Sequence, residues 1–535
     1  MIKHLSLVTV FIILHSLGGL AQSKVTVGKP YDVIDADSKL YFTRGGEILT
    51  VKIDKKKNVI LQKLSSIDLT FKGIKMYDDF PKGAMLEKIT QFKNRYFLFF
   101  TLYEDKLEQL FYREIDFAKG AFIGGSNKLI TSDEKISGMP VMTGFYRFST
   151  TDKFNFYFSY DSSSMVVQYR VQSQIRNDAK SFDRIGLHVF DQTMTEKWGK
   201  RVEMPYTEKK MDNLNYTVDS KGNVYIATRI FEDNTTDLKK RDEEEPNYHL
   251  EILKIESSGK VSSTPVDVAD KFIKTILLYE NAKGSMVGAG YYNKGKQTAN
   301  ADGVMMFSLG ANGKLSNLNT YEIPTDVLNQ YATGREKRQH NRSDKDDKAE
   351  FENLSLRDVV NGKDGSILLV GEQRYAITRT RYNSSTHTSS STTTYYCNDI
   401  LVTKIDPSGK LAWMKKLPKR QLSTVGYYGL SYRYVRGNTN HYFFCLDNEK
   451  NLDLPLSEVP ASHVAGQGGF LTAYIVNDKT GEVMKKSLVD TRDIQGMEVY
   501  QFDPDRIMFT AAYTLVFEAY KKKKEDILVK VVLDH

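Results

Sequence analysis

The sequence predicts an all-β protein built from a repeated four-stranded unit. Phe, Trp and Tyr make up 12% of the 535 residues, and long segments of helical periodicity are few. Residues 399–417, DILVTKIDPSGKLAWMKKL, show half of the unit most clearly. An apolar segment, a turn at residues 406–409 and a more polar segment predict a hairpin whose second strand lies nearer a sheet edge.

The turn before the last strand of each unit is the best marker of the repeat. It recurs at residues 256–260, 311–314, 406–410 and 478–482, each time with Gly followed by Lys or Glu. A supersecondary unit that recurs along a chain indicates a repeat architecture. The expected units occupy residues 31–64, 86–131, 141–203, 214–266, 273–323, 354–417, 429–488 and 497–533.

The first three of these units are irregular, and the eighth is incomplete. The first has expected strands at residues 31–34, 40–42, 48–53 and 59–64, and the third at residues 141–148, 154–160, 185–190 and 198–203. The eighth has only three, at residues 497–502, 507–513 and 527–533.

Units of this size fit the blades of a β-propeller, in which radial closure protects edges that a row of separate hairpins would expose. Residues 526–530 echo residues 399–404, yet the chain ends before a fourth strand. Residues 25–27 form a short β-type segment with no partner nearby. We therefore expect this N-terminal strand to close the ring. Eight four-stranded antiparallel blades are favoured over seven blades plus an irregular N-terminal unit.

Residues 1–21 have the pattern of a secretory signal: Lys3 and His4, an apolar run at residues 5–17, and small residues before Gln22. A membrane anchor is the weaker alternative because the run is short. We expect residues 22–535 to form a single propeller domain, exported to the periplasm or the extracellular space, with no membrane span.

Residues 399–409 together with Trp413 resemble the repeats of secreted bacterial β-propellers, with their DxxVxKxDxxGxxxW-like units. The signal segment followed by Gln22 is similar to that of exported Bacteroidota-type proteins. Such propellers include binding modules and enzymes, so the resemblance implies a fold and no single function.

The long insertions fall on one face of the expected ring. Residues 161–184, 232–249, 374–398 and 447–469 each separate the second and third strands of a unit, and residues 325–352 join two units. Because long loops on a rigid scaffold often carry function, we place a site on this face, at the mouth of the channel. The candidate binding residues are Tyr160, Glu232, Asp233, Tyr292, Arg374, Tyr375, Tyr395 and Asp447.

Two insertions have biased compositions. Residues 334–350 are a mixed charge run, for which a solvated disordered loop is favoured over a partner-binding arm. Residues 383–394 are rich in Ser and Thr and are expected to be flexible. The tyrosines beside this Ser/Thr-rich segment are expected to pack against the protein, with stacking on sugars as the alternative; they are Tyr375, Tyr382, Tyr395 and Tyr396.

No sequence motif indicates catalysis, a metal or a cofactor. HExxH, CxxC, GxSxG and Walker A patterns are absent, so we expect no cofactor and no metal site. Glu232 and Asp233 would do acid–base work only if they faced the channel, and a solvated loop start is favoured. Cys397 and Cys445 could pair in an exported protein, but two buried free thiols are favoured. The net charge of +8 is spread over mixed charges and does not predict nucleic-acid binding.

Three functions remain open. The favoured hypothesis is an exported, monomeric binding module whose partner is a glycan or an envelope protein. The alternative is a glycan-active propeller enzyme, a lyase or hydrolase, with residues at the channel mouth. The third hypothesis is a structural subunit of an envelope complex.

Overall fold

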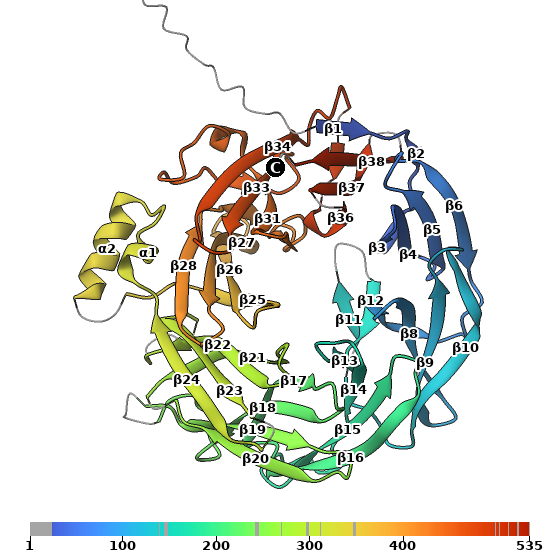
Figure 1. Ribbon diagram of the computed structural model, residues 1–535, viewed down its shortest axis with the longest axis vertical. Helices are drawn as coiled ribbons and strands as arrows, with labels where there is room; N and C mark the ends of the chain where they lie inside the picture. Colours follow the sequence, from blue (N-terminus) through green and yellow to red (C-terminus); the bar gives the residue numbers. More distant parts are fainter. Residues whose placement is uncertain are drawn as a thin grey trace, which may run out of the picture.

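The computed structural model describes residues 24–533, apart from 139, 144–147, 241–244, 269, 296–298, 311, 346–348, 498, 502, 512 and 522–523. Within these residues the strands form eight sheets of four or more strands and a separate two-stranded hairpin. The sheets stand radially around a central opening, and the fold is a β-propeller (Figure 1). The expected signal segment and the Ala311 position of one expected turn lie outside the described residues.

The first four sheets run in chain order. The first contains β3 (Ala36–Arg44), β4 (Glu47–Asp54), β5 (Val59–Ser65) and β6 (Phe71–Tyr77). The second contains β7 (Met85–Phe92), β8 (Arg95–Glu104), β9 (Leu107–Asp116) and β10 (Ala121–Ser132). The two-stranded hairpin, β11 (Pro140–Thr143) and β12 (Phe148–Thr151), precedes the third sheet, which contains β13 (Asn155–Phe158), β14 (Ser164–Arg170), β15 (Phe182–Asp191) and β16 (Glu196–Thr207). The fourth contains β17 (Met211–Val218), β18 (Val224–Phe231), β19 (Tyr248–Ile255) and β20 (Val261–Val266).

The remaining sheets carry the larger additions. The fifth contains β21 (Phe272–Glu280), β22 (Met286–Asn293), β23 (Gly303–Leu309) and β24 (Leu315–Glu322), and is followed by α1 (Thr325–Leu328) and α2 (Gly334–Asp344). The sixth contains β25 (Leu354–Asn361), β26 (Ile367–Asn383), β27 (Thr388–Ile405) and β28 (Leu411–Leu417), extended by β29 (Gln421–Ser423) and β32 (His463–Val464). The seventh contains β30 (Arg433–Arg436), β31 (Asn440–Asp447), β33 (Phe470–Asn477) and β34 (Val483–Asp490), with a 3-10 turn at Glu449–Asn451. The eighth contains β35 (Val499–Gln501), a 3-10 turn at Pro504–Arg506, β36 (Ile507–Ala511), β37 (Thr514–Lys521), β38 (Glu525–Val532), β1 (Lys24–Val27) and β2 (Tyr31–Asp32).

The expected strands of the second unit and of the fourth to seventh units are confirmed, and three units are corrected. In the first unit, the expected strand 31–34 instead pairs with β38, and the polar, exposed β6 was not predicted. In the third, residues 141–148 belong in part to the separate hairpin, and β14 lies where a long loop was expected. In the eighth, β37 was missed. Residues 144–147 lie outside the described part of the chain.

The ring closes as the sequence predicts. β1 pairs antiparallel with β38, with Val25 opposite Val531 and Val27 opposite Val529. Val25 and Val27 pack against the apolar core of the last two sheets. Strands from both ends of the chain therefore share one sheet, which removes the free edge that β38 would otherwise present.

A buried ionic network lies beside this closure, between the first and last sheets. Lys39 and Lys52 are cross-strand neighbours, an arrangement that is unfavourable for two like charges alone. The carboxylate of Glu518 compensates: its Oε1 lies 2.7 Å from Lys52 Nζ, and both side chains are fully buried. The hydroxyls of Tyr31 and Tyr41 donate to the same carboxylate at 2.7 and 2.5 Å.

Asp526 completes the network, 3.4 Å from Lys39 Nζ and 3.7 Å from Lys52 Nζ. Burial alone would raise the pKa of Glu518, but the two ammonium groups outweigh it and hold that pKa well below its usual range. Burial and the charge of Glu518 raise the pKa of Asp526. The network therefore keeps Glu518 ionised where the ring is joined.

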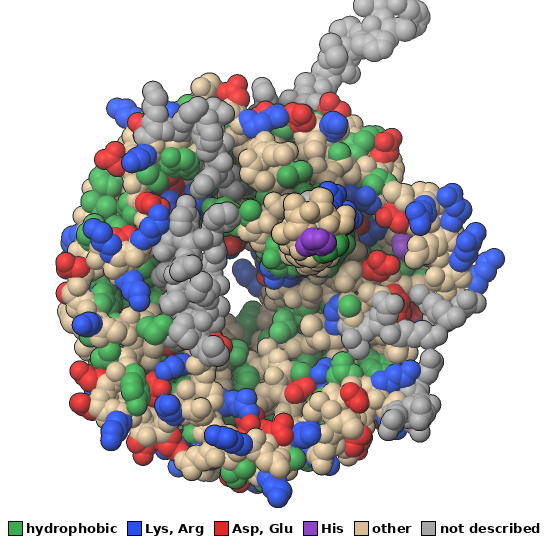
Figure 2. All heavy atoms as spheres, turned by 180° about the vertical axis from the view of Figure 1, so that it is seen from behind, with side chains coloured by type: hydrophobic (Ala, Val, Ile, Leu, Met, Phe, Trp, Pro, Cys, Tyr) green, Lys and Arg blue, Asp and Glu red, His purple; other side chains and the backbone are tan. Residues whose placement is uncertain are grey.

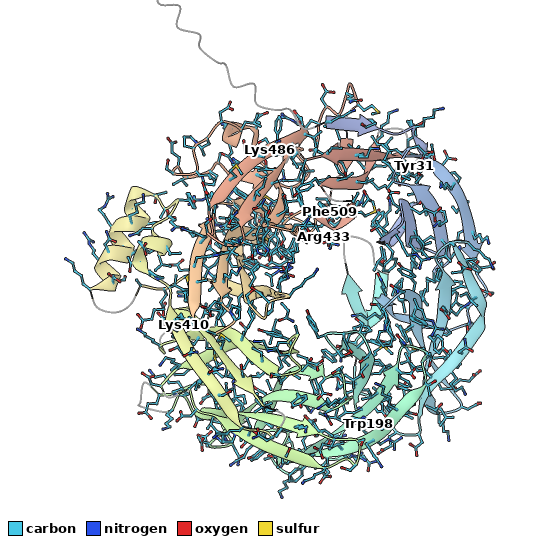
Figure 3. All side chains as sticks on the ribbon, in the orientation of Figure 1. Tyr31, Trp198, Lys410, Arg433, Lys486 and Phe509 are labelled. Atoms are coloured by element: carbon cyan, nitrogen blue, oxygen red, sulfur yellow. The ribbon has the colours of Figure 1, made fainter. Side chains whose placement is uncertain are left out.

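Neighbouring sheets are also linked by side chains that donate to the turn of the next sheet. Trp198 Nε1 donates to the Gly222 carbonyl at 2.9 Å, and Trp413 Nε1 donates to the Asp478 carbonyl at 3.2 Å. Figure 3 shows Trp198 and Lys410 on the outer side of the ring and Arg433 and Phe509 on its inner side. Trp413 thus has a structural role, as the position of its hairpin predicts.

The long connections gather on one face, as expected. The β26–β27 hairpin, residues 448–469 and residues 232–247 each join the second and third strands of a sheet, and α1–α2 joins two sheets. Of residues 161–184, only the segment between β14 and β15 remains in this set, because all of β14, the second strand of the third sheet, lies within them. The β26–β27 hairpin stands out from this face beside the central opening (Figure 2).

We predict that Lys52→Met lowers the free energy of unfolding by about 3–5 kcal/mol, because it leaves the buried Glu518 carboxylate without its nearest cation. Urea unfolding measures this change. The double variant Lys52→Met/Glu518→Gln should recover part of the loss, since it leaves no unpaired buried charge and the amide oxygen still accepts from one of the two tyrosine hydroxyls.

The matched control is Lys55→Met. Lys55 pairs with Asp35 at 2.8 Å on the surface, where both side chains are at least half exposed. This control should change the free energy of unfolding by about 0–1 kcal/mol. Similar losses for the two single lysine variants would contradict a stabilising role for the buried network.

Candidate functional site

The structure brings three of the eight predicted site residues together. Arg374, Tyr375 and Tyr395 lie at the base of the β26–β27 hairpin, where Tyr375 is opposite Tyr396 and Tyr395 is opposite Ala376. Side chains alternate between the two faces of a strand, so Arg374 and Tyr395 lie on one face and Tyr375 and Tyr396 on the other. The base of the hairpin therefore has two distinct surfaces.

The hairpin itself corrects the expectation of a flexible Ser/Thr-rich loop. Residues 374–383 and 388–398 continue the ladder of the sixth sheet outward from the ring. Threonine is β-branched and suits a strand, and the hydroxyls pair across it: Thr378 with Thr393 at 2.9 Å, and Thr380 with Ser391 at 2.8 Å. The low-complexity segment is a rigid projecting arm.

On the first surface, Arg374 and Tyr395 both contact Tyr427. The Arg374 guanidinium carbon lies 3.7 Å from the centre of the Tyr427 ring, a cation–π contact. The Tyr395 and Tyr427 rings meet edge to face with their centroids 5.0 Å apart. Tyr427 comes from the connection between the sixth and seventh sheets, which also pairs with β27 through β29.

On the second surface, two tyrosines form a stacked pair. The rings of Tyr375 and Tyr396 are 4.7 Å apart and inclined by 14°. Asn398 Nδ2 donates to the Tyr375 hydroxyl at 3.3 Å. This pair fixes the Tyr375 ring beside a cavity of about 350 Å³.

That cavity, the helix-side pocket, lies between the hairpin base and α2. It is lined by Leu328, Tyr331, Ala332, Glu336, Gln339, His340, Glu350, Phe351, Glu352, Gln373, Tyr375, Asn398, Asp399, Lys416 and Arg420. One wall is α2, which corrects the expectation that residues 334–350 form a disordered loop. Thr333 and Glu336 form a reciprocal capping box that starts this helix.

Four other predicted site residues lie away from the hairpin base, in the packed interior or in turns. Tyr292 is 1% exposed and packs between sheets, and Asp447 is buried, 3.0 Å from Lys485 Nζ. Asp233 accepts from the Thr235 amide at 2.9 Å and caps a turn. Tyr160 lies in the turn between β13 and β14, on the face opposite the hairpin, because the strand assignment that placed it was shifted by one strand.

Glu232 belongs to a small ionic cluster at the rim of the fourth sheet. Its Oε1 lies 2.8 Å from His249 Nδ1, and Glu251 Oε1 lies 3.1 Å from His249 Nε2. Tyr206 also donates to Glu251, at 2.8 Å. Partial burial opposes protonation of His249, but the two carboxylates outweigh it and raise the pKa of the imidazole.

Sequence reasoning missed the partners that complete the site. Tyr427 was not singled out, although it stands in the segment Gly426–Gly429, where both glycines adopt positive φ of 97° and 72°. The pocket residues on α2 were missed because their segment was interpreted as disordered. The Thr333–Glu336 spacing, which fits a capping box, was the available signal.

The described part of the chain shows no cluster of metal ligands, no disulfide and no helix that could span a membrane. No group of three or more His, Cys, Asp or Glu side chains is arranged to hold a metal ion there. Cys397 and Cys445 are buried free thiols, and burial raises their pKa values to about 11 and about 12. Of the helices in that part, none is long and apolar enough to cross a membrane.

Comparison with known proteins finds structural similarity at low TM-score and low sequence identity. No protein-family model and no curated protein matches the chain. Among solved structures it is similar to a prolyl endopeptidase (TM-score 0.39, 10% identity, 94% of this chain and 55% of that one), so it spans about half the length of that enzyme.

Two shorter proteins are similar over most of their length. One is the β-propeller domain of the trilobed protease from Pyrococcus furiosus (TM-score 0.35, 9% identity, 85% of this chain and 97% of that one). The other is the uncharacterized protein lmo1340 from Listeria monocytogenes EGD-e (TM-score 0.37, 8% identity, 83% and 95%).

We predict that His249→Gln reduces thermal stability more at pH 5.5 than at pH 8.5. The folded-state pKa of His249 is raised, so its contribution is fully present below the unfolded-state pKa, about 6.5, and is lost as the pH rises through the folded-state value. Thermal unfolding of the wild type and the variant at both pH values measures the difference. Equal differences at the two pH values would contradict a charged role for His249.

Proposed function

We propose that this chain is an exported, eight-bladed β-propeller that acts as a binding module. Its binding element is the β26–β27 hairpin together with the surfaces at its base. Residues 1–21, with their signal pattern, support export to the periplasm or the extracellular space. The partner is a glycan or an envelope protein.

The observation that carries the proposal is the projecting arm. About ten residues of each strand extend beyond the ring, which corresponds to about 30 Å at roughly 3.3 Å per residue. Most side chains along it are exposed, yet its backbone is held by a regular ladder. A rigid arm loses little conformational entropy when it binds, so its contacts translate efficiently into affinity.

The composition of the arm also suits recognition. Residues 374–398 contain Arg374, Arg379 and Arg381 and no Asp or Glu, with Ser and Thr filling most of the remaining positions. Guanidinium groups recognise carboxylate, sulfate and phosphate groups through paired hydrogen bonds. The hydroxyls both donate and accept hydrogen bonds.

The glycan-active enzyme is less well supported. Hydrolysis of a glycosidic bond usually requires two carboxyl groups on opposite sides of the scissile bond. Arg374, Tyr395 and Tyr427 at the hairpin base make aromatic and cation–π contacts. Of the carboxyl groups that line the adjacent helix-side pocket, Glu336 accepts from the Thr333 amide, Glu350 is held by Asn293 and Asn300, and Asp399 pairs with Lys416. The geometry at the mouth therefore favours binding.

We predict that shortening the arm removes binding and spares the fold. In this variant a two-residue Asn-Gly turn replaces residues 378–393, and the base of the hairpin remains. Glycan and peptide arrays should lose their wild-type signals with this variant, while the thermal unfolding midpoint stays unchanged.

A charge-matched pair refines the test. Arg379→Ala/Arg381→Ala should weaken the array signals, whereas Arg335→Ala/Arg338→Ala removes the same charge from exposed positions on α2 and should leave them unchanged. Array signals that survive the shortening of the arm would overturn the proposal.

A further inference from the structure

The helix-side pocket holds both hydrogen-bond donors and acceptors around one tyrosine ring. Gln339 and Gln373 supply side-chain amides, and Tyr375 supplies a hydroxyl beside its aromatic ring. Gln373 Nε2 donates to the Glu352 carbonyl at 3.1 Å, which leaves its amide oxygen toward a ligand, and Asn398 orients the Tyr375 hydroxyl. Adjacent hydroxyl groups of a sugar need donors and acceptors side by side, which amides provide. An ammonium or guanidinium ligand would need acceptors alone.

The cations of the pocket are already engaged by the protein. Lys416 Nζ donates to the Leu328 carbonyl at 2.8 Å and lies 3.4 Å from Asp399, and Arg420 lies 3.5 Å from Glu336. An anionic ligand would therefore have to displace existing ion pairs. Among the described residues that line the pocket, no cation is free to anchor a phosphate or a carboxylate.

The acidic groups outnumber these cations. Glu336, Glu350, Glu352 and Asp399 face Lys416 and Arg420, a formal excess of two negative charges. Glu350 is held by the amides of two asparagines, Asn293 and Asn300, each at 2.8 Å. Burial lowers the pKa of His340, which keeps its imidazole neutral near pH 7. The pocket thus disfavours a negatively charged group.

The arm above the pocket has the opposite charge. Residues 375, 377, 379 and 381 alternate onto the face that carries Tyr375, so Arg379 and Arg381 follow the pocket along the same surface. A ligand that leaves the pocket along the arm therefore passes from an acidic to a basic environment.

We propose that this pocket and arm bind an acidic glycan by its end. The terminal sugar, which carries no negative charge, occupies the pocket against Tyr375, and the acidic sugars that follow lie along Arg379 and Arg381. The inference rests on the proposed binding function and specifies its ligand class.

The test measures binding of two hexasaccharides by calorimetry. The first is a hyaluronan hexasaccharide that ends in N-acetylglucosamine and alternates with glucuronate, and the second is uncharged N-acetylchitohexaose. Wild-type protein should bind both, and hyaluronan more tightly. Added salt should reduce this preference, because it screens the arginines. Absence of binding to both sugars, or tighter binding of a fully uronic hexasaccharide, would overturn the inference.

The variants separate the pocket from the arm. Gln373→Ala and Tyr375→Ala should each weaken binding of both sugars by about tenfold, the loss of one or two good contacts. Arg379→Ala/Arg381→Ala should weaken hyaluronan alone. Tyr103→Ala, which removes an exposed aromatic side chain from β8 of the second sheet, is the control and should leave both affinities unchanged. Pocket variants that bind like the wild type would overturn the inference.

The shortened arm distinguishes this inference from the proposed function. It keeps Gln373, Tyr375 and Asn398, so its affinity for the uncharged hexasaccharide should equal that of the wild type, an affinity that calorimetry measures but that is too weak to give a signal on the arrays. If array signals depend on the arm while both pocket variants bind like the wild type, the proposed function stands and the sugar pocket fails. If the uncharged sugar binds and array signals survive without the arm, the arm proposal fails, and the specific claim for an acidic glycan fails with it.

Discussion

The closure of the ring is the constraint on which the rest of the structure depends. Each sheet packs its faces against two neighbours, so the first and last sheets need each other as much as any internal pair does. The pairing of β1 with β38 supplies the missing edge strand, and the Lys52–Glu518 contact joins the two sheets in the interior. A closed ring holds its sheets in fixed positions. Because the β26–β27 hairpin continues the ladder of the sixth sheet, the position of its base is fixed as well. The geometry of the hairpin base is therefore a product of the closure.

Much of the fold could be read from the sequence because the repeat leaves local signals. The Gly-containing turns and the echo of residues 399–404 in residues 526–530 located most units and predicted the closing strand. The errors fall on strands whose surroundings leave a weak pattern. β6 is polar and largely exposed, so it lacks the apolar alternation of a half-buried strand. The aromatic run that forms β13, the first strand of its sheet, was taken for the second strand, so β14 was missed, while the third and fourth strands were assigned correctly.

The candidate site was predictable only where its residues share one insertion. Arg374, Tyr375 and Tyr395 stand within 22 positions of one another, and a hairpin brings them together. Tyr427 and the residues of α2 reach the same place from other connections, and no local pattern encodes that proximity. Composition misled in one further way. A Ser/Thr-rich segment is typical of disorder, but threonine also favours strands, and the buried ladder of the sixth sheet below it provides a template that extends outward.

The shared edge sheet has a consequence for the order in which the molecule can be completed. β1 leaves the ribosome first, and its partner β38 leaves about 500 residues later. During synthesis, β1 must therefore remain without this partner while the intervening sheets emerge. Contacts of such large sequence separation form slowly because the intervening chain must first be ordered. The ring therefore stays open until β38 has been made, and the pairing of β1 with β38 is expected to be a late step of folding.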